Sequence, residues 1–396
     1  MKSITKGAIA LYFLSCPIEL ALNVFFTSST KYIGAIVLGL WAIGIVYNYK
    51  SRYINLSTHL SALLIWIAYD ILITLVLGIS SERTSSYLTS YAMMVLLVII
   101  LCQDDWDKND IELFITAYFI GTIILTAILL LWGESRYIGR ITLSIGGHQR
   151  DPNQTACCIV PGVFIALGKI NQTGKTFLAK IFNVIILLTE FYGIILTASR
   201  GALVSVVVGV AFQIVILNMN KRINIIYYII IIISIYFLMK VVPQQTILRL
   251  ESVDSYTTGS GRTEIWRTLL NSFDARWLIG HGVGSTVAYF NETIGNATGV
   301  HNSFLLVLYE SGLIGFSLFI FSFLSLLIYH IKKKNALFVA LIIGAMVSSL
   351  FLDTLNLRYL WNALILGVVE YNRTSFDQGL DSIEIRVKYR YIRSNI

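Results

Sequence analysis

Apolar runs long enough to cross a membrane recur along almost the whole chain, separated by short polar or charged breaks. A membrane-spanning helix needs about 20 predominantly apolar residues. Twelve runs approach this length, at residues 7–26, 32–49, 60–79, 87–102, 111–132, 154–169, 178–198, 201–217, 223–242, 302–330, 336–352 and 355–371. The pattern predicts an all-α polytopic membrane protein with about twelve transmembrane helices.

Two breaks are longer than the others, a moderate loop at 133–153 and a polar segment at 243–301. Long polar loops between membrane helices often carry function. The expected organisation is therefore transmembrane helices one to nine over 1–242 and an extracytoplasmic loop with short amphipathic helices over 243–301. Transmembrane helices ten to twelve follow over 302–371, and a cytoplasmic tail over 372–396.

Basic residues gather in alternate breaks and so predict the orientation of the chain. Lys and Arg are enriched in cytoplasmic loops of membrane proteins. The basic breaks contain Lys2 and Lys6, Lys50 and Arg52, Lys108, Lys169, Lys175 and Lys180, Lys221 and Arg222, Lys332 to Lys334, and the tail from Arg373 to Arg393. Both termini are therefore expected in the cytoplasm, and the two long breaks on the outer side.

Composition supports the membrane interpretation. Of 396 residues, 56% are hydrophobic and only 13% are charged, and the mean hydropathy is +0.73, far from the balance of a soluble domain. The net charge of +8 is explained by the cytoplasmic loops, so no nucleic-acid partner is expected. The four cysteines have no metal-ligand or redox spacing and are read as small buried hydrophobic residues.

The basic residues on the predicted outer side are mostly arginines. Lysine occurs there only as Lys31 and Lys240. The arginines are Arg83, Arg136, Arg140, Arg150, Arg200, Arg249, Arg262, Arg267, Arg276 and Arg358. Arginine tolerates a membrane interface by snorkelling, and Arg83 and Arg276 are expected to do only that. The surplus as a whole indicates an anionic ligand, because a guanidinium group binds phosphate through a planar fork of donors.

Arg200 occupies a break of almost no length between two apolar runs, within the sequence Thr-Ala-Ser-Arg-Gly-Ala. A charge at the end of a membrane helix is costly unless it is partnered or hydrated. It could be an interface anchor. However, Ser199 and Gly201 allow close backbone approach, and the following helix would direct its positive end to the same place. We expect Arg200 to bind an anion.

The sequence Ser260-Gly-Arg-Thr-Glu-Ile-Trp-Arg267 predicts the start of an amphipathic helix with Ser260 as its N-cap. Such a helix can lie on the membrane surface with Trp266 at the headgroup level. Arg262 shares a face with Trp266, so the helix would hold Arg262 at the depth of a lipid diphosphate. Arg267 is rotated away from that face and is the weaker candidate.

His301 and Asn302 open an apolar run directly after the long polar segment. An imidazole with a pKa near neutrality can take a proton from a hydroxyl, although a lone histidine is often only a satisfied polar residue. His281 is a weaker candidate, because the glycine-rich stretch 280–285 lacks the spacing and context of a phosphate loop.

The first outward loop ends in His148-Gln-Arg-Asp-Pro-Asn153, and its proline suits a helix start. Two interpretations remain equally open at this position. Either Asp151 or Asn153 only caps the following helix, or this segment contacts the substrate through Arg150 and Asn153.

Glu19, Asp70 and Glu310 are acidic residues that lie inside apolar runs. Glu19 and Asp70 either form a proton path or pair with each other or with buried donors. Glu310 would point away from His301 on a continuous helix, so a direct dyad is not expected. Gly312 and Gly315 nearby suggest tight helix packing.

The order of these motifs resembles that of the O-antigen ligase and polymerase family of membrane glycosyltransferases. The motifs are Ser-Arg-Gly at 199–201, Arg262 with Trp266, the glycine-rich stretch, His301-Asn302 and Glu310-Ser-Gly-Leu-Ile-Gly. The resemblance covers roughly residues 150 to 320. It implies a bacterial plasma (inner) membrane enzyme whose arginine-lined outer cavity holds an undecaprenyl-diphosphate-linked oligosaccharide, with no metal or other cofactor. By motif, Arg200 and Arg262 would hold the diphosphate and His301 would assist the acceptor hydroxyl.

The candidate site therefore consists of catalytic and substrate-binding residues. The catalytic residues are His301, Arg200 and Arg262, and the substrate-binding residues are Arg150, Asn153, Arg249, Trp266, Arg267 and Asn302. The expected partners are the lipid-linked donor, an acceptor glycan or glycolipid, membrane lipid and a chain-length regulator protein.

The family resemblance leaves the acceptor open. We expect a polymerase of O-antigen or capsule repeat units. A ligase that transfers glycan to the lipid A core would use the same donor. A transporter or flippase of lipid-linked sugars would need charges through several spans, whereas here the charges concentrate at the outer mouth.

The predicted topology is tested by cysteine labelling. Because basic residues bracket the adjoining spans on the opposite side, a Ser255→Cys variant should react with an impermeant thiol reagent when only the outer barrier of the cell is permeabilised. Labelling that appears only after lysis would place the segment 243–301 in the cytoplasm.

Overall fold

The computed structural model describes residues 2–22, 29–47, 57–103, 106–137, 139–145, 148–220, 225–251, 262–272, 274–295, 299–355 and 357–376. Helices dominate this part of the chain. The first nine are α1 (Lys2–Leu22), α2 (Ser29–Tyr47), α3 (Thr58–Val76), α4 (Glu82–Gln103), α5 (Lys108–Trp132), α6 (Pro152–Ile170), α7 (Phe177–Leu196), α8 (Arg200–Met219) and α9 (Ile225–Val241). The later ones are α10 (Gln244–Glu251), α12 (Arg262–Asn271), the short η2 (Ala275–Trp277), α13 (Ser285–Ile294), α14 (Ser303–Lys332), α15 (Ala336–Ser349) and α16 (Arg358–Phe376).

Each of the twelve predicted apolar runs falls on a helix, namely α1 to α9 and α14 to α16. In the described residues, seven helices are long and apolar enough to cross a membrane: α1, α3, α5, α6, α7, α8 and α14. An eighth is added if α9 and α10, which meet at a 106° bend, form one span. A multi-pass membrane protein is supported, but the number twelve is not confirmed, since α15 has only 14 residues and α4 carries many polar side chains.

The connection between α5 and α6 folds as a small antiparallel sheet, which corrects the all-α prediction. Strand β1 (Gly133–Tyr137) pairs with β2 (Arg140–Ile145), which pairs with β3 (His148–Gln149). A hydropathy pattern does not detect strands this short and polar. The cap proposed for the next helix is confirmed for Asp151, whose Oδ1 accepts from the backbone N–H of Asn153 at 2.7 Å.

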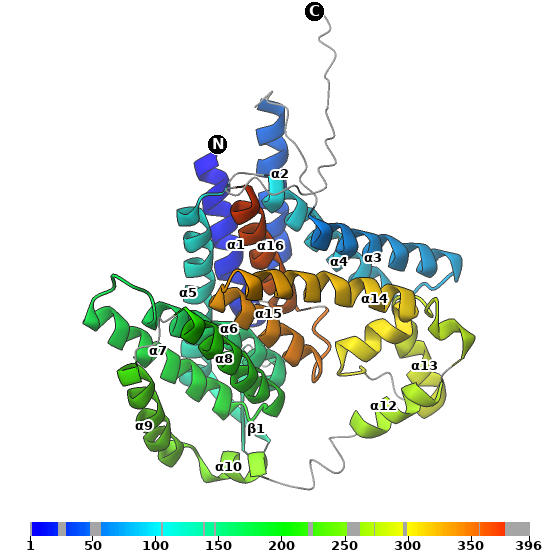
Figure 1. Cartoon of the computed structure of the whole chain (residues 1–396). Coiled ribbons are helices and arrows are strands. Elements are labelled where there is room, and N and C mark those ends of the chain that lie inside the picture. Colours follow the sequence, from blue (N-terminus) through cyan, green and yellow to red (C-terminus); the bar gives the residue numbers. More distant parts are fainter. Residues whose placement is uncertain are drawn as a thin grey trace, which may run out of the picture.

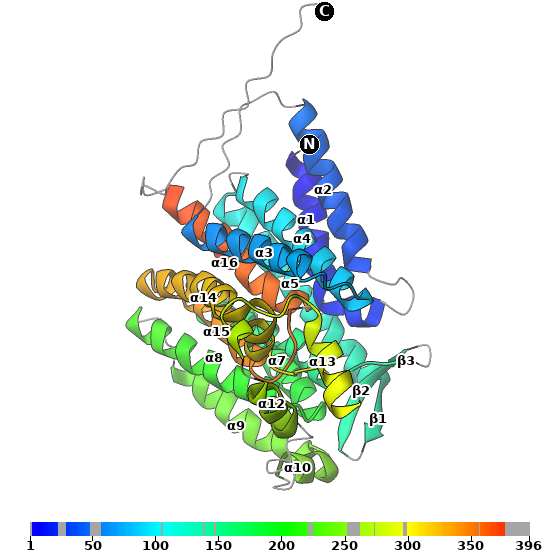
Figure 2. The same cartoon turned by 90° about the vertical axis from the view of Figure 1, so that its right-hand side faces the viewer.

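The long loops lie away from the described ends of the chain. The start of α1 and the end of α16 are at one end of the molecule, whereas the β1–β2 hairpin, α10 and α12 are toward the other (Figure 1, Figure 2). The N-cap predicted at Ser260 and the labelling position Ser255 fall outside the described residues.

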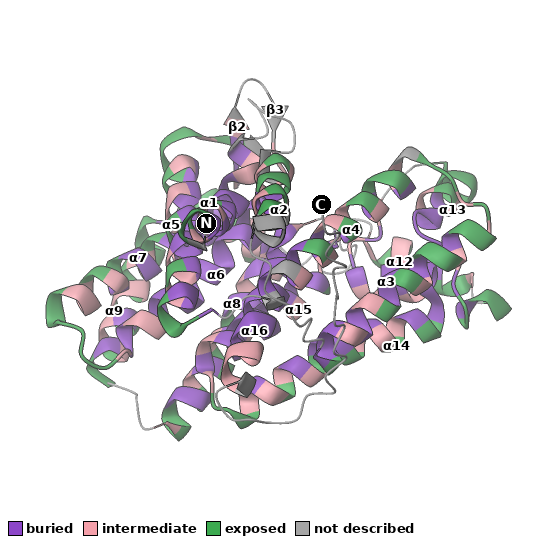
Figure 3. Ribbon diagram, turned by 90° about the horizontal axis from the view of Figure 1, so that it is seen from above, coloured by how far each residue is buried: buried purple, intermediate pink, exposed green. Residues whose placement is uncertain are grey.

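The core is built around α6, α15 and α16, whose residues are mostly buried (Figure 3). Trp66, Trp361 and Phe164 are among the largest fully buried side chains. In contrast, α9 exposes isoleucines such as Ile229 and Ile232. Exposed apolar side chains of this kind are expected on helices that face lipid, where every backbone polar group is satisfied within the helix.

The predicted continuous helix over 302–330 is interrupted at Gly312, which has φ 65° and ψ −175°. This glycine lies against Gly280, because an added Cβ would approach the Gly280 nitrogen to 2.4 Å. The N–H of Gly282 donates to the carbonyl of Glu310 at 2.9 Å. The glycine-rich turn is therefore joined by its backbone to the break in α14, so the predicted helix packing at Gly312 is replaced by a contact with a loop.

The acidic residues inside apolar runs have buried partners. Glu310 accepts from the hydroxyl of Thr286 at 2.7 Å, at the start of α13. Asp70 is buried and hydrogen-bonded to Ser311, the residue after Glu310. Glu19 forms an ion pair with Arg358. Of the alternatives predicted for Glu19, the structure therefore shows pairing with a buried donor.

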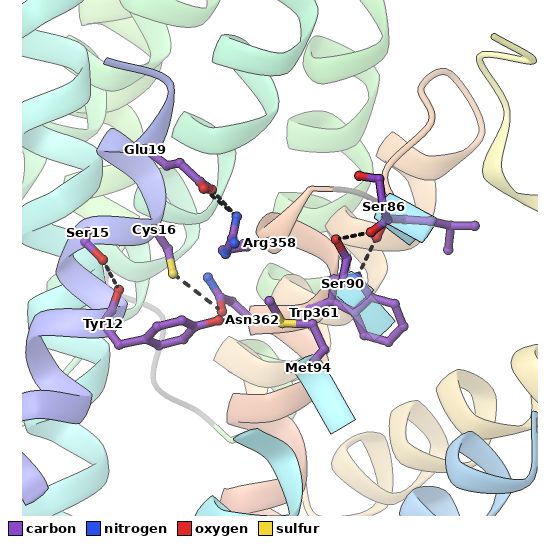
Figure 4. A network of polar contacts seen from close by, with 11 residues as sticks. Tyr12, Ser15, Cys16, Glu19, Ser86, Ser90, Met94, Arg358, Trp361 and Asn362 are labelled. Atoms are coloured by element: carbon purple, nitrogen blue, oxygen red, sulfur yellow. Dashed lines mark hydrogen bonds and ion pairs between the residues drawn. The ribbon is translucent and has the colours of Figure 1, made fainter. Parts of the chain in front are cut away.

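The Glu19–Arg358 pair joins α1 to the first residue of α16 (Figure 4). The Arg358 side chain is only 9% exposed. Beside it, the thiol of Cys16 faces Asn362 Oδ1 at 4.0 Å and the hydroxyl of Tyr12 faces the sulfur of Met94 at 3.6 Å. Removing one partner of a buried ion pair leaves an uncompensated charge, whereas replacing both partners is much less costly.

We therefore predict that Arg358→Ala destabilises the protein by about 3–5 kcal/mol, because the Glu19 carboxylate loses its partner. The double variant Glu19→Leu with Arg358→Met should lose much less. Unfolding of the detergent-purified protein, followed by intrinsic fluorescence, measures both. Wild-type stability of the Arg358→Ala variant would contradict a structural role for this pair.

Candidate functional site

A small pocket lies where α6, α8 and α12 meet the connection between α15 and α16. Its lining residues are Asn153, Cys157, Ser199, Gly201, Ala202, Arg262, Ser348, Phe351 and Leu352. Arg262 and Asn153 are both predicted site residues. Ser199 makes no side-chain cap at the start of α8, so the positive end of this helix adds to the pocket wall.

Four arginines from four different elements gather at this pocket. Burial and the positive charges of Arg249, Arg262 and Arg200 together lower the pKa of Arg140 to about 10, against the opposing charge of Asp151. An arginine pKa is lowered by like charges only when they are close. This cluster, Arg140, Arg200, Arg249 and Arg262, is called the arginine cluster below, and it is a strong candidate for binding an anion.

Hydrogen bonds to the backbone and to an amide hold the arginine cluster in place. Arg140 Nε donates to the carbonyl of Thr197 at 3.0 Å, and its Nη2 donates to Asn153 Oδ1 at 2.7 Å. Arg200 Nη2 donates to the carbonyl of Arg249, which lies on α10. These bonds join β2 to the end of α7 and to α6, and they join α8 to α10.

Arg262 is the first residue of α12, and burial lowers its pKa although Asp151 and Asp353 oppose that effect. The indole N–H of Trp266, one turn later, donates to the carbonyl of Val300 at 2.8 Å. Trp266 therefore fixes α12 beside the residue that precedes His301. Contact of Trp266 with a substrate stays a prediction.

His301 and Ala198 are two of the three non-glycine residues with positive φ in the described chain, at 53° and 49°. Such conformations cost about 1–3 kcal/mol each and cluster at functional sites. Burial lowers the pKa of His301, and the charges that act on it include Asp353, Arg262 and Arg83. The imidazole is therefore neutral at pH 7, the form that accepts a proton.

The two residues after His301 have structural partners. Asn302 Oδ1 caps α14 by accepting from the backbone N–H groups of Phe304 and Leu305 at 3.0 and 3.1 Å. The hydroxyl of Ser303 donates to the carbonyl of Leu352 at 2.9 Å and accepts from the N–H of Thr354 at 2.7 Å. These bonds place Asp353, between Leu352 and Thr354, next to the start of α14.

The family model described as O-antigen ligase matches residues 183–320. Residues 183–320 are therefore similar to the O-antigen ligase family. The match confirms the resemblance drawn from the motifs, and the region contains Arg200, Arg249, Arg262 and His301. A search of the curated proteins finds no match to this chain.

Residues outside the O-antigen ligase region complete the site. Arg140 and Asn153 come from the segment before it, and Asp353 from the segment after it. From the sequence, Arg140 is only one of many outer arginines, and Asp353 is not among the predicted site residues. The available clue was a single acid, Asp353, in the short break between two apolar runs.

The remaining predicted residues lie less centrally. The backbone N–H of Arg150 donates to Leu143 at 2.9 Å, and its buried Nε has no hydrogen-bond partner in the described part of the chain. Arg267 is exposed on α12 and makes no hydrogen bond or ion pair with described residues. His281 stacks on Tyr309 with ring centres 4.1 Å apart. Within the described ranges, no group of three or more His, Cys, Asp or Glu residues could hold a metal ion.

Proposed function

We propose that this protein transfers a glycan from undecaprenyl diphosphate to a sugar hydroxyl on the outer face of the bacterial plasma membrane. The observation that carries the proposal is the arginine cluster close to His301, a half-buried histidine whose pKa is lowered by burial. The O-antigen ligase match over 183–320 supports a ligase- or polymerase-type glycosyltransferase. Its donor and acceptor are part of the proposal.

The arginine cluster would bind the diphosphate of the donor. Burial lowers the pKa of Arg140 and of Arg262, and neighbouring positive charges also lower that of Arg140, so a bound anion would stabilise both guanidinium groups. In the reaction the bond between the anomeric carbon and the diphosphate oxygen breaks, and the leaving diphosphate gains negative charge. Preorganised guanidinium donors stabilise that growing charge in the transition state.

His301 would act on the acceptor. The acceptor hydroxyl forms the new bond to the anomeric carbon and gives its proton to the imidazole. The strained backbone at His301, the cap from Asn302 and the anchor from Trp266 to Val300 fix this ring relative to Arg262. The products are the lengthened glycan and undecaprenyl diphosphate.

We favour a polymerase of repeat units, in which the acceptor is another lipid-linked glycan. A ligase that acts on a glycolipid is the second candidate, because the matching family model is described as O-antigen ligase. Both reactions use the same donor site, so the arginine cluster and His301 have the same roles in either case.

The donor site is tested by conservative substitution. Lysine keeps the charge but cannot reproduce the planar fork, so Arg200→Lys and Arg262→Lys should each lose most of the transfer activity while the protein still inserts and folds. Arg276→Lys, at an exposed outer arginine, is the matched control. Turnover at the wild-type rate by both site variants with the lipid-linked donor would refute the proposed role of these arginines.

The base is tested by removing each outer histidine in turn. General-base catalysis contributes about a hundredfold to ten-thousandfold, so His301→Ala should lose turnover on that scale with little change in donor binding, whereas His281→Ala should be mild. In the wild type, the lowered pKa of His301 should place the acid limb of the rate profile below pH 6.5, because the base is lost only when the ring is protonated. Loss of donor binding at unchanged turnover would assign His301 to the donor instead.

A further inference from the structure

Asp353 has a buried oxygen that the chain itself does not satisfy. Its Oδ1 has no hydrogen-bond partner in the part of the chain that the structure describes. Buried polar atoms are almost always hydrogen-bonded. Because Asp353 is held beside His301 by the Ser303 hydrogen bonds to Leu352 and Thr354, the missing donor is expected to come from a ligand at this place.

Arg83, at the start of α4, reaches the same place. An added Cβ at Gly299 would lie 2.4 Å from Asp353 Oδ2 and 3.8 Å from Arg83 Nη2. Both charged groups therefore flank the backbone at Gly299, and any side chain there would collide with the carboxylate. The two groups do not form an ion pair within 4 Å among the described residues, so their free donors and acceptors remain for a third partner.

The guanidinium of Arg83 is held in place by Tyr87. Its Nη2 donates to the Tyr87 hydroxyl at 3.2 Å, and the group lies 5.5 Å from the centre of that ring. Tyr87 is only 2% exposed. Among the described residues, Tyr87 is the one hydrogen-bond partner of Arg83, so donors of its guanidinium group are available to a ligand.

The Arg83 position is separate from the arginine cluster. Asp353 and Glu310 are the carboxyl groups whose charges act on Arg83, whereas Arg140 experiences Arg249, Arg262 and Arg200. The charges of Arg262, Arg83 and Asp353 all act on the pKa of His301. The imidazole is therefore close to Arg262 of the arginine cluster and also to the pair formed by Arg83 and Asp353.

We propose that Arg83, Asp353 and the backbone at Gly299 form the acceptor subsite, which binds two neighbouring hydroxyls of a sugar ring. This inference rests on the proposed function. One hydroxyl donates to Asp353 Oδ1 and its neighbour accepts from the Arg83 guanidinium, an arrangement that matches the donor and acceptor inventory of both side chains. The acceptor hydroxyl then lies beside His301, opposite the diphosphate.

Full-length protein in lipid nanodiscs tests this subsite with two separate probes. Undecaprenyl diphosphate without glycan measures the donor side as a binding constant. A fluorescent repeat-unit oligosaccharide without lipid measures the acceptor side, as the concentration that gives half-maximal transfer from saturating lipid-linked donor. The variants are Arg83→Gln, Arg83→Lys and Asp353→Asn, with Arg276→Gln as the matched control for loss of an outer positive charge.

Loss of a hydrogen bond to a charged group corresponds to roughly a tenfold to hundredfold weaker interaction. Arg83→Gln and Asp353→Asn should therefore raise the half-saturating acceptor concentration by that factor and change the affinity for undecaprenyl diphosphate by less than about twofold. Arg83→Lys should recover part of the loss, and Arg276→Gln should change neither value. Unchanged diphosphate affinity also shows that the variants are folded.

Two results would overturn the subsite. If acceptor saturation is unchanged in both variants, Arg83 and Asp353 do not bind the acceptor. If diphosphate affinity falls instead, Arg83 belongs with the arginine cluster. A wild-type protein that neither binds undecaprenyl diphosphate nor transfers glycan would refute the proposed function itself, and is thereby distinguished from a failure of the subsite alone.

Discussion

Guanidinium groups repel one another, and the arginine cluster brings four of them to one partly buried place. This repulsion constrains how the four elements that carry these arginines can pack together. The β1–β2 hairpin, α8, α10 and α12 each contribute one arginine. Hydrogen bonds to Thr197, Asn153 and the carbonyl of Arg249 hold Arg140 and Arg200 in place. A site built in this way is most stable with an anion in it.

A second set of contacts fixes the cluster relative to the base. Trp266 ties α12 to Val300, the residue before His301. Ser303 ties the start of α14 to the connection that carries Asp353. The close backbone contact between Gly280 and Gly312 joins the glycine-rich turn to the break in α14. These contacts position the arginine cluster and His301 relative to one another, as the proposed glycan transfer would require.

Much of the fold could be predicted from the sequence because it depends on local patterns. Apolar runs of membrane-spanning length became helices in every case, since lipid-length helices are encoded by composition alone. The order of short motifs correctly indicated the family of residues 183–320. Arg262 lies at the pocket, and Arg200 lies in the arginine cluster beside it. Anion binding by these two residues stays a prediction.

Features that depend on contacts between distant segments could not be predicted. The strands after α5 are short and carry no strong alternation, and the break at Gly312 exists because Gly280 packs against it. Asp353 is a lone acid in a short break, and its proximity to His301 arises from the fold of α14 to α16. In the sequence Arg140 does not differ from the other outer arginines, because its position beside Asn153 depends on the fold of β2.

The most direct test of the account is chain growth by the purified protein. With lipid-linked repeat units as the only substrate, the account predicts longer glycan products and one molecule of undecaprenyl diphosphate released for each new glycosidic bond. Movement of intact lipid-linked glycan across the bilayer of a proteoliposome, without any new glycosidic bond, would contradict the account and identify a transporter.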